Sequence, residues 1–182
     1  GKDIAEPFTA QSVQKKVDKS FGCFSCPIRC GGIVSQPDIG IEESHKPEYE
    51  TLAALGPLIL NDDIDTVFLA NDYLNRVGFD TISMGGILAF ALECMENGII
   101  TKEDTGGLEL GWNNHEDLLD FIKMIVNRGK IGDVLADGVK VAAEKIGKGS
   151  EKYAVHANGL ELPMHDSRYY PSLATSFISD PT

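Results

Sequence analysis

The sequence predicts an all-α fold, with several helices packed at irregular, roughly orthogonal angles and a cysteine loop near the N-terminus. The main observation is that apolar residues recur every three or four positions through most of residues 47–146, which is the spacing of one buried helix face. The second is that a glycine follows most of these periodic segments, as expected at helix ends. The chain has 182 residues, of which 42% are hydrophobic and 24% charged, so it can bury a core.

The predicted elements follow in order along the chain. A short helix is expected over residues 8–20, and residues 21–47 lack any period and are expected to form an irregular loop. Pro47 and the acidic residues after it favour the start of a helix that ends at Gly56-Pro57. Further helices are predicted over residues 62–78, 81–97, 115–128 and 131–146. One short extended piece is expected within residues 153–163, and a loop over residues 164–182.

These elements predict three parts of the chain. Residues 1–47 contain the first helix and the cysteine loop, residues 48–163 form a multihelical domain, and residues 164–182 begin a following domain that is cut short.

The charge balance restricts the partners. The chain has 16 basic and 28 acidic residues, a formal net charge of −12, which argues against nucleic acid and anionic membranes as main partners. No apolar run approaches the roughly 18–20 residues that a membrane-spanning helix needs.

Three cysteines form the strongest chemical motif. Cys23, Cys26 and Cys30 lie within eight residues in a C-x2-C-x3-C pattern, and thiolates are soft ligands that suit zinc or an iron–sulfur cluster. The alternatives are disulfide pairing and plain buried thiols, and the three cysteines alone do not choose between zinc and iron. Cys94 lies in an apolar helical segment and is expected to be a small core residue.

Two further segments contain candidate polar groups. Glu48 and Glu50 are two positions apart and cannot face the same way on a helix, so one can point into a site while the other is solvated. The alternative is an ordinary charged helix start. In Asn75-Arg76-Val77-Gly78-Phe79-Asp80, a polar turn could bind a flat heterocycle, or Asp80 could simply cap the next helix.

The four histidines form no strong motif. Glu42 and His45 have E-x-x-H spacing within a loop and are expected to be a solvated pair, and His115, His156 and His165 stand alone.

Several segments in a fixed order resemble the tungsten-containing aldehyde ferredoxin oxidoreductase family. They are the cysteine loop, Glu48 to Leu52, Leu55 to Pro57, Asn71 to Ser83, and the later pair Arg128 to Asp133 and Gly159 to Pro163. The resemblance extends from about residue 20 to the end of the chain.

The resemblance implies a cytoplasmic enzyme that oxidises a small aldehyde to a carboxylic acid with ferredoxin as electron acceptor. It also implies tungsten, or molybdenum in some relatives, held by two pterins, together with one [4Fe-4S] cluster. An N-terminal β-rich domain of the same parent chain would supply part of the pterin site.

The resemblance assigns roles to single residues. Cys23, Cys26 and Cys30 match the first three cluster ligands, and Glu50 matches the acidic residue near the tungsten centre, where it would handle a proton or polarise the substrate. The fourth cysteine and the active-site histidine of the family would fall beyond Thr182.

The pterin motif of the family falls on the turn after residue 74. It matches Asn75, Gly78, Phe79 and Asp80. Asn75 replaces the first Asp of the motif and keeps an acceptor without the charge, and Phe79 replaces a Leu.

The chain is therefore expected to be a central piece of a longer enzyme, inactive when isolated and prone to self-association through apolar surface that the absent parts would cover. A different class remains open, namely a small zinc-stabilised helical binding module without activity, although no fourth Cys or His stands at zinc-ribbon spacing.

Overall fold

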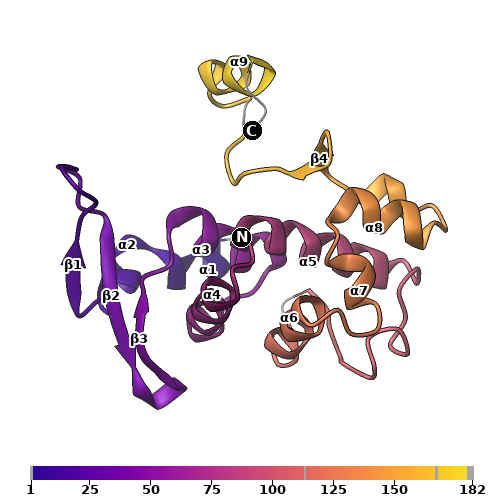
Figure 1. Cartoon of the computed structure of the whole chain (residues 1–182), viewed down its shortest axis with the longest axis horizontal. Helices are drawn as coiled ribbons and strands as arrows, with labels where there is room; N and C mark the ends of the chain where they lie inside the picture. The colour runs from indigo at the N-terminus through magenta and orange to yellow at the C-terminus, as the bar shows by residue number, and fades with distance from the viewer. Residues whose placement is uncertain (1, 113, 167, 180–182) are drawn as a thin grey trace.

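The computed structural model describes residues 2–112, 114–166 and 168–179. The predicted all-α class is wrong, because the fold is α/β. The described residues form a three-stranded antiparallel sheet in the order β1-β2-β3 and a separate two-stranded sheet of β4 and β5 (Figure 1).

The three-stranded sheet occupies much of the segment expected to be a loop. It consists of β1 (Lys19–Phe21), β2 (Gly31–Gln36) and β3 (Ile41–His45), with a short 3-10 turn η2 (Pro37–Ile39) between β2 and β3. In β2 only Gly32 and Val34 are buried, so the period of two involves a single apolar side chain. The strands are short and rich in polar residues, and their hydrogen bonds come from neighbours in space, which is why no local pattern indicated them.

The N-terminal segment is more broken than expected. In place of one helix over residues 8–20, the chain forms α1 (Lys2–Ala5), η1 (Glu6–Phe8) and α2 (Ala10–Gln14) and then enters β1. Thr9 starts α2, because its hydroxyl oxygen accepts a hydrogen bond from the Ser12 N–H at 3.3 Å.

The central helices confirm the predicted pattern. They are α3 (Tyr49–Leu55), the 3-10 turn η3 (Pro57–Ile59), α4 (Ile64–Val77) and α5 (Thr81–Glu96). Asp63 caps α4 and Asp80 caps α5, each through its side-chain oxygen. Gly78 ends α4 with φ 72°, a left-handed conformation that glycine adopts without strain.

The C-terminal third departs from the prediction in two places. Helix α6 (Leu118–Val126) is as expected, but the segment predicted as one helix is divided into α7 (Gly132–Leu135) and α8 (Val139–Ile146). The division falls at Gly138, with φ 86°. After η4 (Ser150–Tyr153), the expected extended piece is a hairpin of β4 (His156–Ala157) and β5 (Leu160–Glu161). The expected final loop contains helix α9 (Pro171–Ser179).

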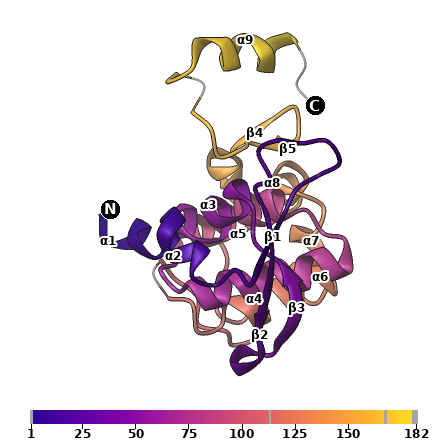
Figure 2. The same cartoon turned by 90° about the vertical axis from the view of Figure 1, so that its left-hand side faces the viewer.

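Helix α5 forms the centre of the main core. It packs against α3, α4, α8 and the strand β5, and its buried residues include Met84, Ile87, Leu88, Phe90, Ala91, Leu92 and Cys94. Burial of Cys94 confirms its predicted role in the core. Figure 1 shows the sheet at one end of the central helices, and α6 to α8 at the other. In both views α9 stands apart from the rest of the chain (Figures 1 and 2).

No single helix in the described ranges is long and apolar enough to cross a membrane. Helices α4 and α5 pass that test of length and composition only as a pair, and the two are bent by 119° at the break between them.

Candidate functional site

The three clustered cysteines lie in the connection between β1 and β2. Cys23 and Cys30 are exposed and Cys26 is half-buried, and none of them is in a disulfide. The Cys26 N–H donates to the Cys23 carbonyl at 3.0 Å, which closes a turn around the first two thiols. A disulfide framework is therefore not formed in this loop.

Glycines let the two ends of the cysteine loop approach each other. A Cβ on Gly22 would lie 2.7 Å from Cγ of Arg29, and one on Gly31 would lie 2.7 Å from the Phe21 ring. With a side chain at either glycine, Arg29 or the Phe21 ring would have to move. The glycines thus allow a loop with a narrow base, in which Cys23 and Cys30 are exposed and Cys26 is half-buried.

The donor set of this loop fits an iron–sulfur cluster, because three thiols are offered by one exposed turn. Across the described ranges, however, no three His, Cys, Asp or Glu side chains are grouped so that they could hold a metal ion. Ligation by Cys23, Cys26 and Cys30 therefore stays a prediction.

Glu50 lies in the first turn of α3, immediately after the sheet. Its Oε2 accepts a hydrogen bond from the Met164 backbone N–H at 2.6 Å, and its Oε1 forms an ion pair with Nδ1 of His165. The neighbouring Glu48 is exposed. Of the two carboxylates, the structure therefore directs Glu50 towards other protein groups and leaves Glu48 at the surface.

The turn between α4 and α5 contains the four residues predicted to bind pterin. Asp80 Oδ1 accepts from the Ser83 N–H at 2.6 Å, so the predicted capping role is confirmed. Asn75 donates from Nδ2 to Asn71 Oδ1 at 3.0 Å, and Phe79 packs against the main core. Pterin binding by Asn75, Gly78, Phe79 and Asp80 is not tested by these contacts and stays a prediction.

Asn75 also lines a polar groove between β3 and α4. The groove has a volume of about 240 Å³ and is lined by Glu43, Ser44, His45, Asp72, Asn75 and Arg76. Partial burial acts to raise the pKa of Asp72, but hydrogen bonds from Arg76 and Ser44 and the Arg76 charge outweigh it and lower that pKa. Asp72 therefore remains ionised in the groove at neutral pH.

A larger, mainly apolar cavity lies between α5 and the C-terminal segment. Its volume is about 810 Å³, and its apolar wall includes Leu58, Phe90, Trp112 and Leu162. Glu93, Lys152, His165 and Asp166 supply its polar groups. Hydrogen bonds from the side chain and the backbone N–H of Arg168 lower the pKa of the exposed Asp166 to about 2. The cavity thus has an apolar wall and charged groups beside it.

Sequence reasoning missed two groups that the structure brings to this region. His165 meets Glu50 across more than a hundred positions of chain, and no local spacing indicates such a contact. Glu161 is only 7% exposed, and its Oε1 accepts a hydrogen bond from the Val139 N–H at 2.7 Å, at the start of α8. In the sequence, the one signal for a buried Glu161 is that this charged residue lies within the otherwise apolar segment Leu160 to Pro163.

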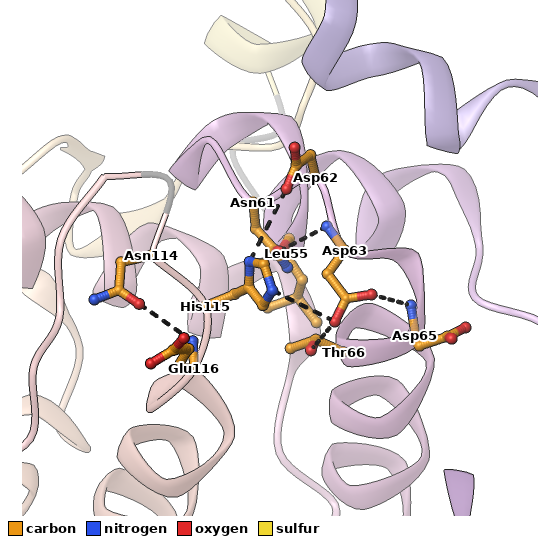
Figure 3. A network of polar contacts seen from close by, with 9 residues as sticks. All are labelled: Leu55, Asn61, Asp62, Asp63, Asp65, Thr66, Asn114, His115 and Glu116. Atoms are coloured by element: carbon orange, nitrogen blue, oxygen red, sulfur yellow. Dashed lines mark hydrogen bonds and ion pairs between the residues drawn. The ribbon is translucent and has the colours of Figure 1, made fainter. Parts of the chain in front are cut away.

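A second histidine, His115, contacts carboxylates of a distant segment. Figure 3 shows His115 between two carboxylates, with Nδ1 3.9 Å from Asp62 Oδ1 and Nε2 3.8 Å from Asp63 Oδ2. Asp63 is also the cap of α4 and accepts from Thr66 Oγ1 at 2.6 Å. His115 therefore connects the segment before α6 to the start of α4. His45 and Glu42 are exposed, as expected for a solvated pair.

Comparisons with known proteins connect the chain to one family. The family model described as aldehyde ferredoxin oxidoreductase, domains 2 and 3, matches residues 2–182. A tungsten-containing aldehyde ferredoxin oxidoreductase of Pyrococcus horikoshii is 41% identical over 149 residues, covering 80% of this chain and 24% of the relative. The aliphatic sulfonate oxidoreductase WOR-like subunit of Pyrococcus furiosus is 33% identical, covering 84% of this chain and 25% of the relative.

One solved structure has the same fold. It is the active-site complex BamBC of benzoyl coenzyme A reductase with 1,5-dienoyl-CoA, with a TM-score of 0.69 and 30% sequence identity. The match covers 81% of this chain and 22% of that chain. The chain spans about a quarter of the length of the curated relatives it matches.

Proposed function

The chain belongs to the aldehyde ferredoxin oxidoreductase family, and on that premise we propose that it is part of an oxidoreductase that converts an aldehyde to a carboxylic acid and passes the electrons to ferredoxin. The observation that carries this proposal is the exposed loop of three free thiols within a chain that matches the family model over residues 2–182. The substrate, the acceptor and a cytoplasmic location are properties of the proposed parent enzyme.

In this proposal, residues of this chain would have the following roles. Cys23, Cys26 and Cys30 would ligate a [4Fe-4S] cluster. The cluster supplies one-electron transfer, and the tungsten or molybdenum bis-pterin of the parent enzyme supplies two-electron redox chemistry. Glu50 would hold or release a proton at its carboxylate oxygens during the reaction.

The turn after α4 offers groups that can bind a flat heterocycle. Asp80 Oδ1 is occupied by the cap of α5, so Oδ2 is the oxygen that would accept a hydrogen bond from a ring N–H. Asn75 would add an amide. Gly78 would let the backbone approach, because its Cβ position is open space. An N-terminal domain of the parent chain would complete this site.

The metal content of the full-length parent protein tests the proposal. After anaerobic purification, we expect iron and tungsten or molybdenum by mass spectrometry and a cluster signal by low-temperature electron paramagnetic resonance. Cys26→Ser should lower the iron content, whereas Cys94→Ser, at a buried thiol away from the loop, should not. One zinc per chain without iron would instead favour the zinc-stabilised binding module.

Activity of the parent and of the 182-residue chain provides the second measurement. The parent should reduce a viologen dye with crotonaldehyde, and the chain alone should not, because it spans about a quarter of its relatives. Exposed apolar side chains such as Phe24 (100% exposed) support contact with absent parts or self-association of the isolated chain. Turnover by the chain alone would contradict the proposal that the active site is completed by other parts of the parent enzyme.

A further inference from the structure

Two segments that are distant in sequence meet at Glu50. Its Oε2 accepts from the Met164 N–H at 2.6 Å and its Oε1 pairs with His165 Nδ1. Tyr49 strengthens the same contact, because its hydroxyl donates to the Met164 carbonyl at 3.3 Å and its ring lies 5.3 Å from the His165 ring. Both oxygens of the carboxylate are therefore held by one dipeptide.

The contact favours a hydrogen on one of the two ring nitrogens of His165. Because a carboxylate oxygen can only accept, the contact between Nδ1 and Glu50 Oε1 is attractive when Nδ1 carries a hydrogen. In a neutral ring with that hydrogen, Nε2 is the acceptor. The side chains of Glu50 and His165 are 24% and 43% exposed, so solvent screens the pair only in part.

The segment that holds Glu50 also forms part of the large cavity. Pro163, Met164 and His165 all line it. Pro163 limits the backbone just before the two holding residues, and Glu161 anchors the same segment to α8. The carboxylate is thus fixed between the start of a helix and a restrained segment at the cavity wall.

We propose that His165 is a positioning residue for Glu50: it fixes one orientation of that carboxylate beside the cavity, so that a proton is held or released at a defined place. The inference rests on the proposed function, in which Glu50 is the proton-handling residue. It adds a histidine that lies in this chain, 115 positions after Glu50, and that no motif indicated.

Two substitutions at one position test the proposal in the full-length parent enzyme. His165→Phe keeps a ring and removes the donor, whereas His165→Asn keeps an N–H donor close to the place of Nδ1. We expect His165→Phe to lower kcat roughly 10- to 100-fold, the range seen when partners that orient a metal-site group are removed, with KM changed less than about threefold. His165→Asn should recover most of kcat. His115→Asn, at a second histidine between two carboxylates, is the matched control and should leave both constants unchanged.

A spectroscopic measurement on the 182-residue chain gives a readout independent of turnover. Nitrogen-15 spectra of the imidazoles should show the Nδ1–H form for His165 at alkaline pH, and Glu50→Gln should change that signal while leaving His156 unchanged. Equal losses in the Phe and Asn variants, a change in KM alone, or a His165 signal insensitive to Glu50→Gln would each overturn the inference.

The two proposals fail in different ways. An inactive wild-type parent that contains its metals would contradict aldehyde oxidation. In that case the nitrogen-15 result alone decides whether His165 positions Glu50. An active wild type with a fully active His165→Phe variant would contradict only the positioning role.

Discussion

Glu161 is predicted to stabilise the fold by capping a helix from a distant strand. Helix α8 begins after Gly138, which has no side chain to cap it, so its first N–H groups lack partners within the helix. Glu161, on β5, supplies the missing acceptor to Val139 at 2.7 Å. Its Cβ and Cγ also fill the space beside Gly86 of α5, where an added Cβ would lie 2.8 Å from Glu161 Cγ.

The magnitude follows from burial and charge. The side chain is 7% exposed, so a hydrogen bond to its charged oxygen contributes about 1.5–3 kcal/mol, and its charge at a helix N-terminus adds about 0.3–1 kcal/mol. Glu161→Met keeps the volume but leaves the Val139 N–H without an acceptor. It should therefore lower the free energy of unfolding by about 2–4 kcal/mol. Glu161→Gln keeps an acceptor and should cost about 1 kcal/mol.

Urea unfolding followed by circular dichroism measures this effect. The control is Glu144→Met, at an exposed position on the same helix, which should change the unfolding free energy by less than about 0.5 kcal/mol. Equal stability of Glu161→Met and the control variant would refute the capping role, and so would a Gln variant as unstable as the Met variant.

Three further predictions concern single residues. Burial and the Glu93 charge raise the pKa of Cys94 to about 11, so iodoacetamide should alkylate Cys94 only after unfolding, and modification of Cys94 in the native chain would contradict this. Because the Asp166 pKa is lowered to about 2, the stabilisation from this carboxylate should be complete above its ordinary pKa near 3.8 and lost as pH falls through about 2. Nuclear magnetic resonance titration should show that midpoint, and Arg168→Gln should raise it. Gly85→Ala would place a Cβ 2.6 Å from the Ala54 Cβ. The overpacking should cost about 1–3 kcal/mol and the better helix propensity of Ala should offset about 1 kcal/mol of it, so the urea midpoint should fall. A raised midpoint would show that α3 and α5 separate at no cost.

Much of the helical part could be predicted from the sequence, because helix hydrogen bonds join residues four positions apart. The predicted segments 62–78 and 81–97 correspond to α4 and α5. The Asp80 cap and the buried Cys94 also follow from neighbouring residues. The ordered motifs indicated the family that the comparisons then showed.

The sheets could not be predicted in the same way. Strand β2 pairs with β1 and β3, and its six residues include two glycines and two polar side chains, so the pattern in sequence is weak. The stabilising partners lie on other strands. The division of α7 from α8 was likewise missed, because a glycine inside an apolar period is compatible with a continuous helix until tertiary contacts select the turn.

For the candidate site, the sequence by itself determined the chemical groups, namely the three thiols of one loop and the Glu50 carboxylate at the start of a helix. Only the tertiary structure decided what holds that carboxylate. The Glu50 partners Met164 and His165 lie more than a hundred positions away, and no local spacing encodes that distance. The contact exists because α3 and β5 both pack against α5 in the main core, where burial of apolar surface supplies the driving force.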